Sequence, residues 1–306
     1  MDAILLELRE VDRGELAAIR ELTATAPCPI IVLTPAAASG WESSRVFAAL
    51  SSGAFDAAPV PRIVGTGRIL GGEGLHVRLE TAARLLRATT QPPAPPDPQR
   101  GREIAILPQS GPLVAIGASA GGPGALAAIL TRLPTSFPGA IVVVQHIEER
   151  FAAGLVMWLA GRSALPVRAA VDWDCPTPGT VLVAASNDHL VLAASGRLEH
   201  LAARAETSHR PSIDVFFRSV AAHWHARQIG VLLTGMGSDG ALGLLAMRGA
   251  GAATLAEAKE TCIVYGMPKV AAELGAATEI TRLENIPDRL MSLCADSSSQ
   301  GKASHV

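Results

Sequence analysis

The sequence has few charged and few aromatic residues. Of its 306 residues, 18% are charged and 4% are aromatic, and the formal net charge is −2. Without an excess of basic residues, the chain lacks the electrostatic footprint of a nucleic-acid or membrane-surface binder, so we expect no nucleic acid among its partners. Its apolar runs are shorter than the ~18 residues that a membrane-spanning helix needs, so we expect no membrane insertion.

Paired cysteines and an N-terminal signal are also absent. The four cysteines lie far apart, without the CxxC spacing of a zinc site or the pattern of a disulfide framework. The chain starts with MDAI, which has no basic segment followed by a hydrophobic one. We therefore expect reduced thiols, no bound metal and a cytoplasmic location. The cysteines are Cys28, Cys175, Cys262 and Cys294.

Hydrophobic residues are abundant. At 49% they suffice for a substantial core, and the length allows two modest domains. Short apolar runs alternate with segments of helical periodicity, a pattern typical of an α/β fold with a parallel sheet. We expect a small α/β segment at 1–88, a proline-rich linker at 89–112, a larger α/β domain at 113–294, and a frayed polar tail at 295–306.

The first segment resembles the second half of a response-regulator receiver domain, mostly through residues 42–61. Glu7 stands where such domains keep the phospho-acceptor aspartate, and Val60 where they keep a lysine, so we expect no phospho-acceptor. Glu7 is either a permanent mimic of a charge or a solvated strand end. A truncated receiver and a misassigned start both stay open as explanations. The predicted strands lie at 2–8, at 29–34 and from 53, and the predicted helices at 14–25, 42–52 and 75–87.

The second domain opens with a strand, a glycine-rich turn and a helix. The apolar residues 113–116 predict the strand, and 125–130 predict the helix. Between them, Gly117-x-Ser119-x-Gly121 has the spacing of a nucleophile elbow, which exposes the serine hydroxyl beside the free N–H groups of a helix start. The alternative is an ordinary glycine-rich turn between a strand and a helix.

Two further reactive side chains follow predicted strands of this domain. His146 comes directly after 140–145, and Asp239 lies in the glycine-rich loop after 231–234. Because ligands bind at the carboxyl ends of strands in an open parallel sheet, we predict that Ser119, His146 and Asp239 converge as nucleophile, general base and orienting carboxylate. Taken singly, the histidine can be structural and the aspartate a helix cap.

Other residues of these loops are candidates for the pocket. The backbone N–H of Met236 is a candidate oxyanion donor, Gly121 shapes the turn after the serine, and Arg210 offers a cation near a developing charge. Ser212 can equally be a plain N-cap. Three histidines have no metal-ligand spacing and are interpreted as structural or surface residues, namely His189, His223 and His225.

Five separated motifs stand out in this domain: GASAGG at 117–122, QH at 145–146, RPSIDVFF at 210–217, TGMGSDGALGL at 234–244 and YGMP at 265–268. Together they resemble one family, the protein-glutamate methylesterases that act on chemotaxis receptors (CheB family). The resemblance implies a doubly wound, mostly parallel sheet of Rossmann-like, three-layer architecture. It also implies catalysis by Ser119, His146 and Asp239, with the oxyanion held near Met236 and no cofactor.

The same resemblance implies a substrate and partners. The substrate is the cytoplasmic domain of a methylated chemoreceptor, from which glutamate methyl esters are removed as methanol and in which certain glutamines are deamidated. A histidine kinase of the same pathway is a second partner. The segment SRVFAAL resembles the branch that serves Wsp-type surface-sensing pathways.

Two other functions are weighed against this one. Gly117-x-x-x-Gly121 and Tyr265-x-x-x-Lys269 match the spacing of a short-chain dehydrogenase, although Pro268 interrupts the helix that such an enzyme needs between its tyrosine and lysine. A catalytically silent regulatory binding module is the second alternative, suggested by the incomplete receiver segment.

Overall fold

The computed structural model divides the chain into two units, Met1–Pro95 and Pro96–Val306. In the larger unit it describes residues 111–202 and 210–295. In the smaller unit it describes 3–7, 13–25, 28–34, 52–64 and 68–70, with short pieces between 46 and 79. Most of the helix predicted at 75–87, the linker and the tail beyond residue 295 lie outside the described residues.

The smaller unit contains the predicted three-stranded parallel sheet, in the order β1-β2-β3. Strand β2 is its most buried part, since Ile31 and Val32 have no exposed surface. Glu7 ends β1 and is exposed. A short antiparallel pair that the sequence did not predict, β4 and β5, follows the sheet. The elements are β1 (Ile4–Glu7), α1 (Arg13–Thr25), β2 (Ile30–Thr34), β3 (Asp56–Pro59), β4 (Arg62–Val64) and β5 (Arg68–Leu70).

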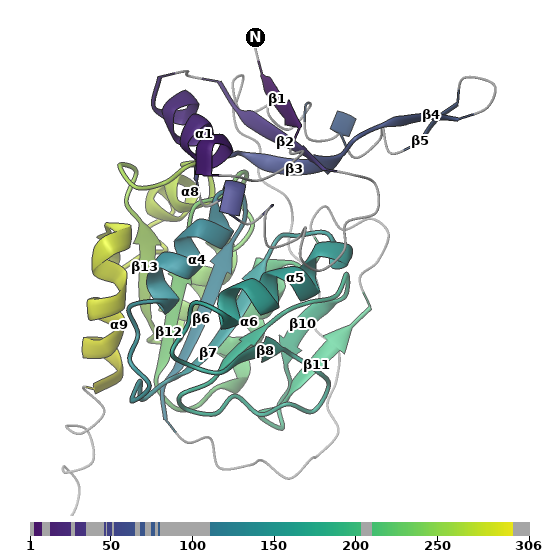
Figure 1. Cartoon of the computed structure of the whole chain (residues 1–306). Coiled ribbons are helices and arrows are strands. Elements are labelled where there is room, and N and C mark those ends of the chain that lie inside the picture. Colours follow the sequence, from purple (N-terminus) through teal and green to yellow (C-terminus); the bar gives the residue numbers. More distant parts are fainter. Residues whose placement is uncertain are drawn as a thin grey trace, which may run out of the picture. The chain divides into compact units, whose positions relative to one another are not determined.

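The larger unit is built on a seven-stranded sheet in the order β14-β13-β12-β6-β7-β9-β8 (Figure 1). Every pairing in it is parallel. This sheet confirms the predicted fold class. Its strands are β6 (Leu113–Ala118), β7 (Ala140–Gln145), β8 (Val167–Ala169), β9 (Val181–Val183), β12 (Gln228–Leu232), β13 (Ala253–Glu257) and β14 (Glu279–Thr281).

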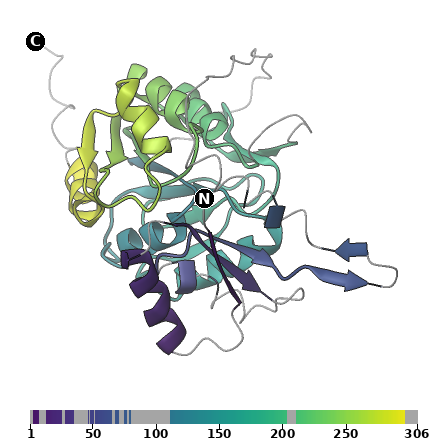
Figure 2. The same ribbon diagram turned by 90° about the horizontal axis from the view of Figure 1, so that it is seen from above.

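Helices cover both faces of this sheet. Helix α4 connects β6 to β7, whereas α7 connects β12 to β13 in the opposite direction across the sheet. Because parallel crossovers are right-handed, the two helices lie on opposite faces, as Figure 2 shows. The helices are α4 (Gly122–Leu130), α5 (Glu149–Ala160), α6 (Ile213–His223), α7 (Ala241–Gly249), α8 (Met267–Glu273), the 3-10 helix Leu283–Asn285 and α9 (Ile286–Ala295).

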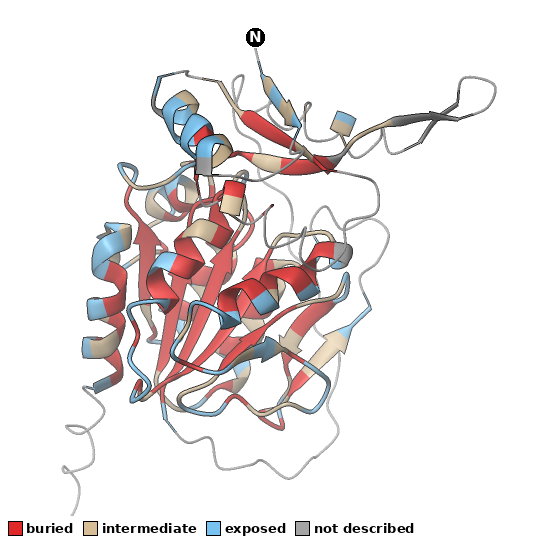
Figure 3. Ribbon diagram, in the orientation of Figure 1, coloured by how far each residue is buried: buried red, intermediate tan, exposed pale blue. Residues whose placement is uncertain are grey.

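The core follows from this layering. Strands buried on both faces need continuous apolar sequence, and all residues of β6 and β7 are buried (Figure 3). An antiparallel hairpin, β10 (His189–Leu192) with β11 (Leu198–Leu201), packs on α6. In the part of the chain that the structure describes, no helix is long and apolar enough to cross a membrane.

Several elements differ from the prediction. Strand β12 spans Gln228–Leu232, so it starts three residues and ends two residues before the strand predicted at 231–234. The prediction was displaced because apolar residues continue past Leu232, the last paired residue, into the loop. Strands β8 and β11 and helix α9 were not predicted. Each of the two strands is short and includes a charged residue, so neither shows the continuous apolar run that identifies a buried strand.

Candidate active site

The candidate site lies at the topological switch point of the sheet, between β6 and β12. Strands β6 and β12 are neighbours, and the strands that follow each of them add to opposite sides of the sheet. A crevice forms outside the carboxyl ends of two such strands, and this is where open α/β sheets bind ligands. The turn that carries Ser119 leaves β6 at this edge, and the loop that carries Asp239 leaves β12.

The turn after β6 is fixed by its neighbour, the segment after β12. The N–H of Ser119 donates to the carbonyl of Thr234 at 3.0 Å, and the hydroxyl of Thr234 donates to the carbonyl of Ala120 at 2.9 Å. Gly121 then adopts a left-handed conformation (φ 78°) as the N-cap of α4, a geometry that glycine accepts without strain. The predicted strand–turn–helix is therefore present, and Ser119 is half-buried on it.

His146 and Asp239 meet at the same edge. Nε2 of His146 lies 2.8 Å from Oδ2 of Asp239, and both side chains are largely buried, with 13% and 6% of their surface exposed. An ionised carboxylate only accepts hydrogen bonds, so Nε2 carries the hydrogen in this contact. Nδ1 is then the ring nitrogen with the lone pair.

Asp239 accepts further hydrogen bonds from the start of α6. Its donors there are the hydroxyl of Ser212 at 2.9 Å and the N–H groups of Ile213 and Asp214 at 2.8 and 3.0 Å. Burial opposes ionisation of this carboxyl, but the hydrogen bond and charge of His146 and these N–H groups outweigh it, so the pKa of Asp239 lies well below its usual range. Asp239 is therefore a permanent anion at neutral pH.

One interpretation of the sequence made Asp239 the cap of the helix that follows it, but the structure shows otherwise. The N-cap of α7 is Gly240, which has no side-chain cap, and the carboxylate of Asp239 instead caps α6. Ser212 is the N-cap residue of α6, as its position suggested, and its Oγ also accepts from the N–H of Val215. The site is thus assembled on the N-terminus of α6, whose dipole favours a carboxylate there.

Gln145 connects the two strand exits. Its side-chain amide, 2% exposed, donates to the carbonyl of Ser119 at 2.8 Å and to the carbonyl of His146 at 2.9 Å. One buried amide thus holds the backbone of both residues in register. The motif at 145–146 pointed to this residue, but its role depends on a contact that the sequence does not show.

Glu257 is a buried carboxylate behind the site. It ends β13 with no exposed surface, and its Oε2 accepts from the N–H of Thr234 at 2.8 Å. Burial raises the pKa of this carboxyl, and the bond from Thr234 only partly opposes the shift. Sequence reasoning missed Glu257, because a glutamate at the end of an apolar strand normally indicates a solvated strand end.

The structure places the remaining predicted residues as follows. Met236 is half-buried in the loop after β12, and among the hydrogen bonds of the described residues none uses its backbone N–H. Arg210 is exposed. His189 is buried, its Nδ1 accepts from the N–H of Ser212 at 3.0 Å, and burial lowers its pKa, as suits a structural histidine.

The hydroxyl of Ser119 makes no hydrogen bond to any residue that the structure describes. The backbone brings Ser119 to the edge that holds His146 and Asp239, but the contact between hydroxyl and imidazole that general-base catalysis requires is not formed. Catalytic hydrogen bonds are often open in the absence of substrate. The described residues also contain no cluster of three or more potential metal ligands.

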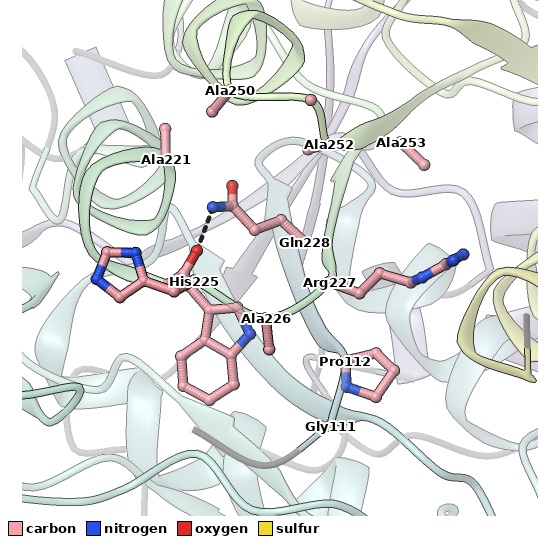
Figure 4. A pocket seen from close by; sticks show the side chains of 12 residues that line it. Gly111, Pro112, Ala221, His225, Ala226, Arg227, Gln228, Ala250, Ala252 and Ala253 are labelled. Atoms are coloured by element: carbon pink, nitrogen blue, oxygen red, sulfur yellow. Dashed lines mark hydrogen bonds between the residues drawn. The ribbon is translucent and has the colours of Figure 1, made fainter. Parts of the chain in front are cut away.

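A hollow at the opposite end of the sheet is separate from this site. It lies at the amino ends of β6 and β12, where the amide of Gln228 donates to the carbonyl of Trp224 (Figure 4). None of the predicted site residues lines it. Its lining combines small residues with His225 and Arg227 and carries no carboxylate, serine or cysteine.

The dehydrogenase alternative is wrong. Tyr265 precedes α8, which begins at Met267, so Tyr265 and Lys269 do not lie on one continuous helix.

The four cysteines are free, as the sequence predicted.

Known proteins resemble this chain along most of its length. It is 47% identical to a protein-glutamate methylesterase/protein-glutamine glutaminase of Burkholderia thailandensis, over 95% of this chain and 84% of that protein. A protein of the same name from Cupriavidus metallidurans is 44% identical over 96% of this chain and 85% of its own length. The crystal structure of the Thermotoga maritima CheB methylesterase catalytic domain is 38% identical and superposes with a TM-score of 0.58, covering 60% of this chain and 99% of that domain. The profile of the CheB methylesterase family matches residues 114–290, and the chain belongs to this family.

Proposed function

We propose that this chain is a serine hydrolase that removes methyl esters from glutamates of a methylated chemoreceptor. The reaction releases methanol, and the same route deamidates receptor glutamines. The observation that carries the proposal is the contact between His146 and Asp239 beside the turn of Ser119. The names of the relatives, which are protein-glutamate methylesterases and protein-glutamine glutaminases, support the substrate.

Ser119 is the nucleophile in this mechanism. Its Oγ attacks the side-chain carbonyl carbon of the glutamyl ester, and Nδ1 of His146 takes the hydroxyl proton, because Nε2–H is held by Asp239. Among the described residues the Ser119 hydroxyl makes no hydrogen bond that would have to break before it meets the imidazole. The anionic Asp239 stabilises the imidazolium that forms.

We infer that two backbone N–H groups hold the oxyanion. In a nucleophile elbow the residue after the serine supplies one donor, which here is Ala120. Met236 supplies the other. Within the described part of the chain, neither N–H donates a hydrogen bond, so both are available to the tetrahedral intermediate.

The remaining steps return the enzyme to its starting state. The tetrahedral intermediate collapses, His146 gives its proton to the leaving methoxide, and methanol departs. Water then loses a proton to His146 and attacks the acyl-enzyme, and the carboxylate leaves as Ser119 regains its hydrogen. With a glutamine substrate, ammonia replaces methanol.

The roles of the smaller unit are also proposals. We infer that residues 1–88 act as a receiver-like segment without a phospho-acceptor, and that 89–112 link it to the catalytic domain at 113–294. A histidine kinase as partner and the Wsp-type branch rest on the resemblance alone, and the cytoplasm as location rests on the scattered cysteines. Incubation with the phosphorylated kinase tests the absence of an acceptor, because a phosphorylated chain would contradict it.

Replacing the nucleophile tests the proposed reaction. We expect the Ser119→Ala variant to lose methanol release from a methylated chemoreceptor by at least about 10³-fold, with unchanged unfolding. A fluorophosphonate probe should label the wild-type chain at Ser119. Ser292→Ala, an exposed serine on α9, is the matched control. Wild-type methanol release by Ser119→Ala would show that the assignment is wrong, and a wild-type chain without activity would favour the silent binding module.

A further inference from the structure

Two aspartates next to the site exchange helix caps: Asp239 caps α6, which contains Asp214, and Asp214 caps α7, which follows Asp239. Asp239, which precedes α7, accepts hydrogen bonds from the N–H groups of Ile213 and Asp214 in the first turn of α6. Asp214 in turn accepts from the N–H groups of Gly243, at 2.5 Å, and Gly240 at the start of α7. The starts of α6 and α7 are therefore fixed to each other by an exchange of carboxylates, each placed at the positive end of a helix dipole.

Burial disfavours the ionised form of the Asp214 carboxyl. The pKa of this carboxyl is raised to about 6, mainly by burial and also by the charge of Asp239, although the N–H of Gly243 opposes the shift. Arg218 on the same helix lowers it slightly. An asparagine of the same shape could accept the N–H of Gly243 without bringing a second negative charge next to Asp239. The hydrogen bonds alone therefore do not require an acid at this position.

We propose that Asp214 is a positioning residue for the hydrolytic reaction: its carboxylate fixes the turn that carries Asp239 and adds a negative charge behind the Asp239–His146 pair. This inference rests on the proposed function. In that reaction the negative charge stabilises the positive charge that develops on the imidazole of His146 when it takes the serine proton.

The other charged groups around Asp214 do not supply this effect. From the loop after β12 it faces Asp239, and on its own helix it faces Arg218, whose charge has the opposite sign. From β10, His189 lies near Asp239, and burial lowers its pKa, so it is neutral at pH 7. Asp214 is thus the second anion behind the pair.

The test compares Asp214→Asn with Asp214→Ala. Asparagine retains the acceptor for Gly243 and removes the charge. We expect its free energy of unfolding at pH 7.5 to equal or exceed that of the wild type, and its kcat for methanol release to fall by roughly 10-fold. KM should stay within about twofold, because the charge acts on the transition state and not on substrate binding. Alanine removes both features and should also lower stability.

The control and the contrary outcome are as follows. Asp288→Asn, an exposed acid on α9, should leave kcat and KM unchanged. The proposal is overturned if Asp214→Asn keeps the kcat of the wild type and only its stability is altered. The proposed function fails through a different result, wild-type methanol release by Ser119→Ala, so the two failures are distinguishable.

Discussion

Nε2 of His146 donates to Oδ2 of Asp239 at 2.8 Å, across 93 positions of sequence. In the usual serine-protease template the carboxylate binds Nδ1 and the serine faces Nε2. In this chain the carboxylate contacts Nε2, so the proposed mechanism assigns Nδ1 to the serine. The chemistry is unchanged, because a neutral imidazole has one donor and one acceptor nitrogen and Asp239 fixes which is which.

Gln145 offers a prediction about alignment. Gln145→Met removes the amide that holds the carbonyls of Ser119 and His146, so the two side chains should lose their alignment. We expect kcat for methanol release to fall by roughly 10-fold or more, with KM little changed, because small displacements of catalytic groups are costly. Steady-state kinetics on samples of verified folding measure this.

Gln228→Met is the matched control for that variant. Gln228 is also a buried glutamine at a strand end whose amide donates to a backbone carbonyl, but it lies at the opposite end of the sheet. Both variants should lose stability, and only Gln145→Met should lose kcat per folded molecule. An equal loss of kcat in both would mean that Gln145 has no special role in the site.

Gly235 tests the close packing of the two loops. A Cβ at this position would lie 2.7 Å from the Cβ of Ser119, so Gly235→Ala must displace the serine turn or its own loop. We expect methanol release to fall by roughly 100-fold. Gly249→Ala, at the end of α7, meets nothing within 4 Å and should keep full activity and gain slightly in stability. Wild-type rates in Gly235→Ala would contradict the packing described.

Stability should depend on pH with opposite signs at two buried carboxyls. The pKa of Asp239 is lowered in the folded chain, so its contribution is present above the unfolded value of 3.8 and is lost as pH falls below it. The pKa of Glu257 is raised, so its contribution is present below the unfolded value of 4.5 and is lost as the pH rises through its folded pKa. Urea unfolding from pH 3 to 8 measures both effects.

Two variants separate these contributions. Asp239→Asn should flatten the loss of unfolding free energy below about pH 4, because its folded and unfolded states no longer differ in protons bound at this site. Glu257→Gln keeps an acceptor for the N–H of Thr234 and should flatten the decline toward neutral pH. If the slopes of the wild type and both variants coincide, the assigned pKa directions are wrong.

The residues themselves determined the fold class and indicated the candidates for the site. Continuous apolar runs at 113–116 and 140–145 identify strands buried on both faces, and the spacing of Gly117, Ser119 and Gly121 identifies the turn, because these signals are local. Parallel strands share one carboxyl edge, so reactive residues after them converge. The exceptions are β8 and β11, short strands that are held by their neighbours rather than by their own pattern.

Only the tertiary structure decided how the site is held. The bonds from Gln145 to Ser119, from Thr234 to Glu257 and from Gly243 to Asp214 span 26, 23 and 29 positions, and no local pattern predicts such pairs. The same holds for Asp239, whose carboxylate caps α6 rather than the helix beside it in sequence. Periodicity and spacing indicate the secondary structure of the segment in which a residue lies. Hydrogen bonds to backbone groups far away in the sequence form only when the strands have taken their order in the sheet.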